Sequence, residues 1–547
     1  MNLDKEIIMN LHDGKDCSGT LFATDKAHGL YSPSHFVLRL SPKNHRILSG
    51  LPSGLSFGSN RDPEVYQAFS TYLHETVHWW QHVGSTSGLM QSLSVPAQMF
   101  ANFGSIKRLL KLVGPKKSIR ALSEAIPSTG DPNSEGGLAA IISNNFFDIS
   151  AFYFLVTRPD EARKIVNSPY FESVGHAYYI SYSNIVANIA GSIDEPFSVF
   201  PNPKAWSDGF TMLRESKAAN FHYGSDVTLS PIGARYIFEG QARFCQLQYL
   251  YFSSRGKLSW KDVEDAGMFG DTYVRAFNAY LKMTGLQWPN SIDDPVVALF
   301  LLICDMAINP GTGFPFSIDC YETFLEDVDP GWRFIYLCHI VGTRCPELAS
   351  TIQSYSRDEY VSVSTRLANE LLIHSPISIS GEISGWSNRS NIIKDLMDEY
   401  DVYKFEDKNL IIRFLLAHHI SFNRDKFLMP EFFCWPGTWM YGDRFRDQIG
   451  EAFSRHGAPF IDKEDDDGVF PVIRPNLSPE NIYETFNKFY QYVVAFDMTE
   501  QLINDNGPFR YDFKWLSCFA KAGEIKNFVD DMFFHAYGIY PDDFSIL

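Results

Sequence analysis

The sequence has few cysteines, and they are not paired. Eight cysteines are spread over 547 residues, and no two of them form a CxxC pair. This spacing argues against zinc knuckles and a dense disulfide framework, which need closely spaced cysteines. The first ten residues also lack the basic start and apolar run of a secretory signal. We therefore expect a protein of a reducing compartment, the cytoplasm.

Long apolar runs and positive charge are also scarce. The strongest apolar run, Pro295 to Cys304, spans about half of the ~20 residues that cross a bilayer. Lys and Arg number 47 against 65 Asp and Glu, a formal charge of −18. Such a surface repels phosphate backbones and anionic lipid, so we expect no nucleic-acid partner and no membrane partner.

Helical patterns dominate what is present. Hydrophobic residues make up 45% of the chain, which is typical of a globular protein. A strand is predicted at 35–40, and the predicted helices are 63–83, 94–113, 136–156, 174–192, 231–253, 260–284, 294–307, 357–373, 390–402, 408–420 and 478–503. Irregular segments are expected at 191–210, 375–390 and 442–478, the last with a solvated acidic run at 464–467. The predicted fold class is mainly α with a small N-terminal β region (α+β).

The segment from Asp62 to Gly84 predicts the most informative helix. Asp62 is a favourable N-cap, and Gly84 is a favourable helix end. Between Val65 and Val83 the one formally charged side chain is Glu75, whereas a surface helix carries several charges on its exposed face. We therefore expect a central, buried helix whose polar side chains serve a purpose.

This helix contains the motif HExxH at His74, Glu75 and His78. Residues four apart lie one turn above each other, so both imidazoles can reach one metal ion. Glu75 can then act as general base toward a water molecule that zinc has made more acidic. His82 shares this face but lies about 12 Å along the helix from His74, too far to bind the same ion.

The motif and the uncharged residues around it resemble the zincin metallopeptidases over about 20 residues. The residues that carry the resemblance are Thr71, Tyr72, Leu73, Thr76, Val77, Trp79 and Trp80, together with the motif. The metzincin branch has a third histidine six residues past the second, where this chain has Gly84. The gluzincin branch instead takes a glutamate from a later helix, which the resemblance assigns to Glu239.

Glu239 stands in an EGxA pattern that is similar to the ExxA segments of gluzincins. It is the one acidic residue between Ser230 and Phe252, in a predicted helix of its own. The family carries an aspartate four positions later, where this chain has Arg243, so the groups that orient the ligands must differ. The alternative interpretation is an ion pair of Glu239 with Arg235 or Arg243. Rival third ligands, left open here, are Glu172, His176 and His222.

The resemblance implies a tyrosine or histidine that stabilises the oxyanion. The available candidates are His176, Tyr178, Tyr179, His222 and Tyr236, and His222, in an expected loop, is taken as the catalytic residue. His418 and His419 lie in an apolar helix and are expected to be core histidines.

The sequence thus predicts a zinc metallopeptidase with ligands His74, His78 and Glu239 and catalytic residues Glu75 and His222. Residues 1–255 are expected to form a zincin-like catalytic domain with an inserted helical region, and residues 256–547 a helical accessory domain that covers the substrate. The expected partners are a peptide or protein substrate and an activating or inhibiting protein. The alternatives are a zinc amidase or deformylase on the same ligands, and a non-catalytic helical interaction protein with a structural metal.

Overall fold

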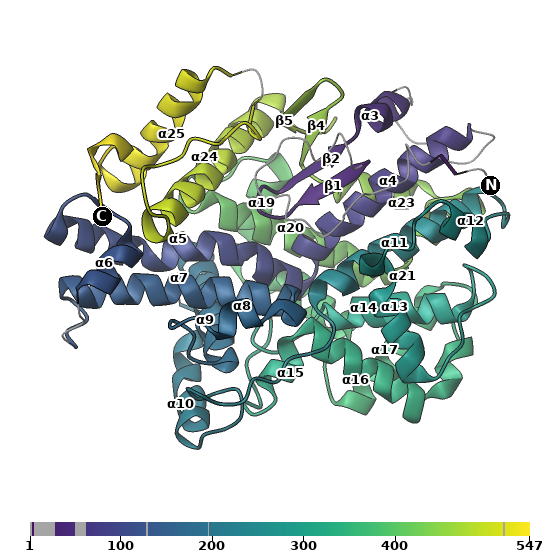
Figure 1. The fold of residues 1–547 in the computed structure, drawn as a ribbon. Helices are drawn as coiled ribbons and strands as arrows, with labels where there is room; N and C mark the ends of the chain where they lie inside the picture. The colour runs from purple at the N-terminus through teal and green to yellow at the C-terminus, as the bar shows by residue number, and fades with distance from the viewer. Residues whose placement is uncertain (1–2, 5–27, 50–61, 127–129, 195, 518–519) are drawn as a thin grey trace.

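A computed structural model describes residues 3–4, 28–49, 62–126, 130–194, 196–517 and 520–547 (Figure 1). Of the chain, 66% is helical and 4% is in strands, which confirms the mainly α class. The strands are β1 (Gly29–Ser32), β2 (Val37–Leu40), β3 (Lys116–Lys117), β4 (Phe460–Lys463), β5 (Asp466–Pro471) and β6 (Ser545–Ile546).

The helices of the first half lie close to their predicted positions. They are α3 (Pro42–Ser49), α4 (Pro63–Trp79), η1 (Trp80–Gly84), α5 (Thr86–Val113), α6 (Ile119–Ala125), α7 (Glu135–Thr157), η2 (Pro159–Glu161), α8 (Arg163–Val166), α9 (Val174–Ile193), η3 (Pro203–Trp206), α10 (Ser207–Glu215) and α11 (Ala234–Ser253). Helices α4 and α11 pack against each other near the centre of the molecule, and α5, α7 and α9 form an adjoining bundle (Figure 1).

The second half is also helical. Its elements are α12 (Trp260–Asp265), α13 (Asp271–Thr284), α14 (Pro295–Ala307), α15 (Phe324–Val328), α16 (Pro330–Thr343), η4 (Pro346–Ser350), α17 (Arg357–Leu371), α18 (Pro376–Arg389), α19 (Asn391–Val402), α20 (Leu410–Leu428), α21 (Pro430–Cys434), α22 (Pro436–Trp439), η5 (Gly442–Arg444), α23 (Asp447–Arg455), α24 (Pro479–Asn504), α25 (Ala522–Tyr537) and η6 (Pro541–Asp543).

The main sheet joins strands from both ends of the sequence. Its order is β1-β2-β4-β5, with β1 antiparallel to β2, β2 parallel to β4, and β4 antiparallel to β5. The small N-terminal β region is therefore present, and two strands from beyond residue 455 complete it (Figure 1). The regions predicted on either side of residue 255 share this sheet and one hydrophobic core.

Two segments expected to be irregular are ordered elements. The segment 375–390 forms α18, capped by Ser375 and packed on α20 through apolar residues that include the fully buried Trp386. Its glycines and serines favour a loop locally, and tertiary packing overrides that preference. The segment 442–478 holds α23 and the β4–β5 hairpin, whose turn is the acidic run at Glu464 and Asp465.

Helix α7 is long and apolar enough to cross a membrane by length and composition. In the fold, 61% of its most apolar window is buried, and it packs on α5 and α9 as a core helix does.

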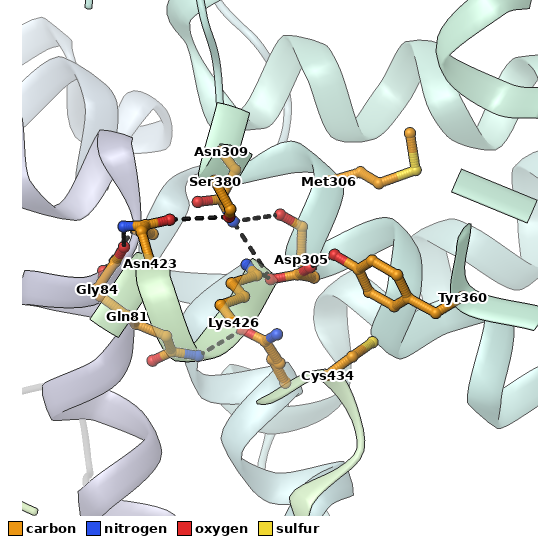
Figure 2. A network of polar contacts seen from close by, with 12 residues as sticks. Gln81, Gly84, Asp305, Met306, Asn309, Tyr360, Ser380, Asn423, Lys426 and Cys434 are labelled. Carbon is orange, nitrogen blue, oxygen red and sulfur yellow. Dashed lines mark hydrogen bonds and ion pairs between the residues drawn. The ribbon is translucent and has the colours of Figure 1, made fainter. Parts of the chain in front are cut away.

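A buried polar network ties the helices of the second half to the end of η1 (Figure 2). The Nζ of Lys426 on α20 lies 2.5 Å from Oδ1 of Asp305 on α14, and both side chains are at most 5% exposed. The Tyr360 hydroxyl donates to Oδ2 of Asp305. On the next turn of α20, the Asn423 amide donates to the carbonyl of Gly84 at 3.0 Å. The network fixes how α14, α17 and α20 meet the central helix.

We expect Lys426→Met to destabilise the protein by about 3–5 kcal/mol, because it leaves the buried Asp305 carboxylate without its cation. Adding Asp305→Asn should recover part of the loss. Urea unfolding followed by circular dichroism measures both. Lys394→Met, at an exposed position of α19, is the matched control and should change stability by less than about 0.5 kcal/mol. An unchanged midpoint for Lys426→Met would contradict this account.

Candidate metal centre

Helix α4 is a buried central helix, as its lack of charge predicts. Asp62 caps it by accepting a hydrogen bond from the Glu64 backbone N–H at 3.1 Å. From Tyr66 to Trp79 every side chain except Tyr72 is buried. The helix then passes into the π-helical turn η1, a distortion that is frequent at functional sites.

Three side chains converge between α4 and α11. Nε2 of His74 and Nε2 of His78 lie 3.1 Å apart, and Oε2 of Glu239 lies 3.6 Å and 3.4 Å from them. A tetrahedral ion with bonds of about 2.0–2.1 Å places its ligands roughly 3.3–3.4 Å apart. The spacing therefore suits a metal ion, and the three residues form a group that could hold one.

Glu239 does not form the alternative ion pairs. Within the described chain its carboxylate pairs with the two histidines and with neither Arg235 nor Arg243. The Arg243 guanidinium lies over the Tyr273 ring, 4.0 Å from its centroid, and donates to Gln246. The residue that replaces the family's aspartate is thus engaged elsewhere.

The rival ligands lie outside this group. His176 faces Asp148 and Glu172, with Nε2 3.3 Å and 3.6 Å from their carboxylates. The Nδ1 of His222 contacts the Ala218 carbonyl at 3.0 Å, on the loop after α10. None of these residues belongs to the three-residue group.

The charges of the three groups are strongly coupled. Burial works to lower the pKa of His78, but the neighbouring Glu239 carboxylate outweighs it and raises that pKa to about 9. His74 has its pKa lowered by burial to about 3. Burial would raise the pKa of Glu239, and the two histidines instead hold it well below its usual range. The site thus contains a carboxylate and one proton that an incoming cation would displace.

Glu75 lies under strand β1. A Cβ at Gly29 would come within 2.7 Å of Oε1 of Glu75 and 2.9 Å of the Thr71 methyl, so the strand crosses the helix at a distance that requires glycine. The Tyr31 backbone N–H donates to the Glu75 carboxylate. Burial raises the pKa of Glu75 to about 7, which suits a general base near neutral pH.

Gln81 orients one ligand, and the sequence analysis did not identify it. Its side-chain amide donates to the Phe238 carbonyl at 2.9 Å and to the Gln241 side chain at 2.8 Å. Its oxygen must therefore accept from Nδ1–H of His78, at 2.8 Å. With the proton fixed on Nδ1, the Nε2 lone pair is available to a metal. The sequence signal was an amide three residues past His78 in a nearly uncharged helix.

A cavity of about 640 Å³ opens above the three ligands. Its walls come from β1, α4, η1, α5, the end of α7 and the start of α11. Among the described residues beyond 255, only Glu500 of α24 lines it. Tyr31 and Tyr153 line this cavity, whereas His222 does not. His222, the catalytic residue predicted from the sequence, therefore lies outside the cavity that holds the three-residue group.

The histidines of α20 are packing groups, whereas His82 packs between two rings and also lines the cavity. His82 lies 8% exposed between the rings of Tyr31 and Phe238. His418 accepts from the Trp79 indole at 3.1 Å, and burial holds its pKa well below the usual value. His419 contacts the Val83 carbonyl through Nδ1. The prediction of core histidines in α20 is confirmed.

Comparison of the chain with protein-family models, curated proteins and solved structures gave no match.

Zinc affinity should rise about tenfold per pH unit between pH 6 and 8. Because the pKa of His78 is raised to about 9, its Nε2 is protonated throughout this range, and zinc must displace that proton. Competition with a chromophoric chelator at pH 6, 7 and 8 measures the slope. His74→Ala should abolish stoichiometric binding. An affinity independent of pH would show that zinc displaces no proton from His78 in this range.

Gln81→Met should weaken zinc binding by about 10–100-fold without unfolding the protein, because His78 loses the acceptor that fixes its tautomer. The same chelator competition measures this. The matched control is Gln248→Met, which removes a buried amide on α11 that accepts from Thr438 and contacts none of the three residues of the group. Equal affinities of the two variants would argue against the orienting role.

Proposed function

We propose that this chain is a zinc-dependent metallopeptidase of the gluzincin type. The observation that carries the proposal is the meeting of His74, His78 and Glu239 at ligand spacing, with the Glu75 carboxylate one residue from the first ligand and buried in the same cavity. Two imidazoles and one carboxylate with an open position are the ligand set of catalytic zinc in several peptidases.

The donor set fits zinc by its chemistry as well as by its spacing. Burial lowers the pKa of His74 and so favours its neutral imidazole. Gln81 accepts from Nδ1–H of His78 and so sets the tautomer of that ring. A zinc ion held here would polarise a substrate carbonyl and lower the pKa of a water molecule toward about 7.

The protein groups would then handle the protons and the charge. Glu75 takes a proton from the attacking water and returns it to the leaving amine nitrogen. Its raised pKa suits both transfers, because the carboxylate must gain and lose a proton near neutral pH.

Tyr31 is the best-placed group for the developing oxyanion. Its hydroxyl is buried, lines the cavity and has no hydrogen-bond partner among the described residues. Burial raises its pKa well above the usual value, so it stays protonated and can donate. Tyr31 thus replaces His222 in our assignment.

The cavity favours a peptide over a small amide. Its volume of about 640 Å³ lies within the range of ligand sites. Strand β1 stands at one end of the strand order of the main sheet, and Leu30 and Tyr31 of that strand line the cavity. An extended peptide can add to such an edge through main-chain hydrogen bonds.

Glu75→Gln should keep one zinc per chain and lower kcat for peptide hydrolysis by at least about 100-fold, because the amide cannot accept the water proton. Elemental analysis and cleavage of a peptide library, set beside small amides and formyl-peptides, measure this. Exposed Glu451→Gln on α23 is the matched control and should retain full activity. A fully active Glu75→Gln variant would rule out the mechanism, and turnover of small amides alone would redirect it to an amidase.

A further inference from the structure

Two guanidinium groups line one wall of the cavity. Arg158 follows the end of α7, and Arg235 lies in the first turn of α11. Arg235 precedes the ligand Glu239 by four residues, so the two side chains share one face of α11, about 6 Å apart along its axis. Positive charge beside a proposed reaction centre is notable in a chain of net charge −18.

Arg235 has no counterion in the described part of the chain. It is half-buried, and neither a hydrogen bond nor an ion pair joins it to another described residue. The nearby carboxylates are already engaged. Oε2 of Glu239 faces the two histidines, and Asp160 accepts from the Tyr236 hydroxyl at 2.7 Å and from Arg275 at 3.1 Å. A half-buried guanidinium without a carboxylate is available to one from a ligand.

The wall that carries these arginines is rigid. A Cβ at Gly233 would lie 2.3 Å from the Thr157 carbonyl and 2.5 Å from the Pro159 ring, so the start of α11 is pressed against the end of α7. The Tyr236–Asp160 hydrogen bond holds the same junction. The backbone positions of Arg158 and Arg235 are thereby fixed relative to the metal ligands, as specific recognition requires.

One acidic side chain from α24, Glu500, also lines the cavity, and burial together with the nearby carboxylates of Asp497 and Asp505 raises its pKa to about 7. Glu500 lines the metal cavity and also a smaller adjoining cavity, together with Asp497 and His35. Phe146 of α7 lines the smaller cavity, and Arg158 lies 12 residues further along, about 18 Å at 1.5 Å per residue.

We propose that Arg235 binds a carboxylate of the substrate and makes this site selective for acidic peptides. The inference rests on the proposed function, because it names the substrate class of the same site. Guanidinium binds carboxylate through two parallel hydrogen bonds, which gives orientation as well as affinity. The carboxylate belongs either to an Asp or Glu side chain or to the C-terminus of the peptide.

Binding to the full-length, zinc-loaded Glu75→Gln protein tests this without turnover. The probes are acetylated and amidated alanine-based octapeptides that carry a single Glu at each position in turn, with Gln at the same position as the neutral partner. A second series has a free C-terminal carboxylate. We expect at least one carboxylate-bearing peptide to bind about tenfold or more tightly than its neutral partner, by calorimetry, and the two series distinguish the source of the carboxylate.

Adding Arg235→Gln should abolish that difference, and Arg235→Glu should shift the preference to a Lys-bearing peptide. Arg235→Lys should retain part of it. The matched control is Arg163→Gln, which removes an exposed charge on α8 outside the cavity and should leave the preference intact. Zinc content is measured for every variant.

Equal binding of acidic and neutral peptides, or no binding of either, would overturn the inference. A different result tests the proposed function. If the wild-type chain hydrolyses neutral peptides without preference, peptidase activity stands and the role of Arg235 falls. If binding depends on Arg235 and a carboxylate while no peptide is hydrolysed, the role of Arg235 stands and the proposed peptidase activity falls.

Discussion

The site depends on the close approach of two imidazoles and one carboxylate between helices α4 and α11. Their ligand atoms lie 3.1–3.6 Å apart in a largely buried site. Burying ionisable groups carries a desolvation cost that must be offset by partners in good geometry. Without a cation the offset comes from the pairing of His78 with the Glu239 carboxylate, whose Oε2 lies 3.4 Å from Nε2. With a divalent cation, all three groups gain a common partner. The rest of the site serves to hold this arrangement.

Three parts of the surrounding fold hold these side chains in place. Strand β1 covers Glu75 at a distance that Gly29 alone permits. The π-helical turn η1 brings Gln81 to His78 and to α11 at once. The buried network around Lys426 and Asp305 anchors the end of η1 from the C-terminal half (Figure 2). The second half of the chain therefore contributes mostly by packing against the helices that carry the site, since Glu500 alone among its described residues lines the cavity.

Local signals explain what could be predicted from the sequence. The cap at Asp62, the uncharged helix and the histidine spacing predict α4 and two candidate ligands, and the resemblance to gluzincins points to Glu239 as the third. The partners of Gln81 and Tyr31 depend on contacts between segments far apart in the chain, which no local pattern encodes. The same limit applies to α18, whose composition favours a loop until Trp386 packs on the core. His222 was selected from the sequence as a loop histidine. It contacts the Ala218 carbonyl and does not line the cavity.

The hydrogen bonds of Gln81 also bear on whether the fold needs a bound metal. One side chain accepts from the ligand His78 and donates to α11, the helix that supplies the ligand Glu239. The two ligand-bearing helices are therefore joined by protein groups before any ion arrives. In zinc fingers the ion supplies the folding free energy, because too little core exists without it. Here α4 and α11 are embedded in an extensive core. It follows that removal of a metal from this site should leave the fold intact, as the proposed catalytic role requires and a purely structural metal would not.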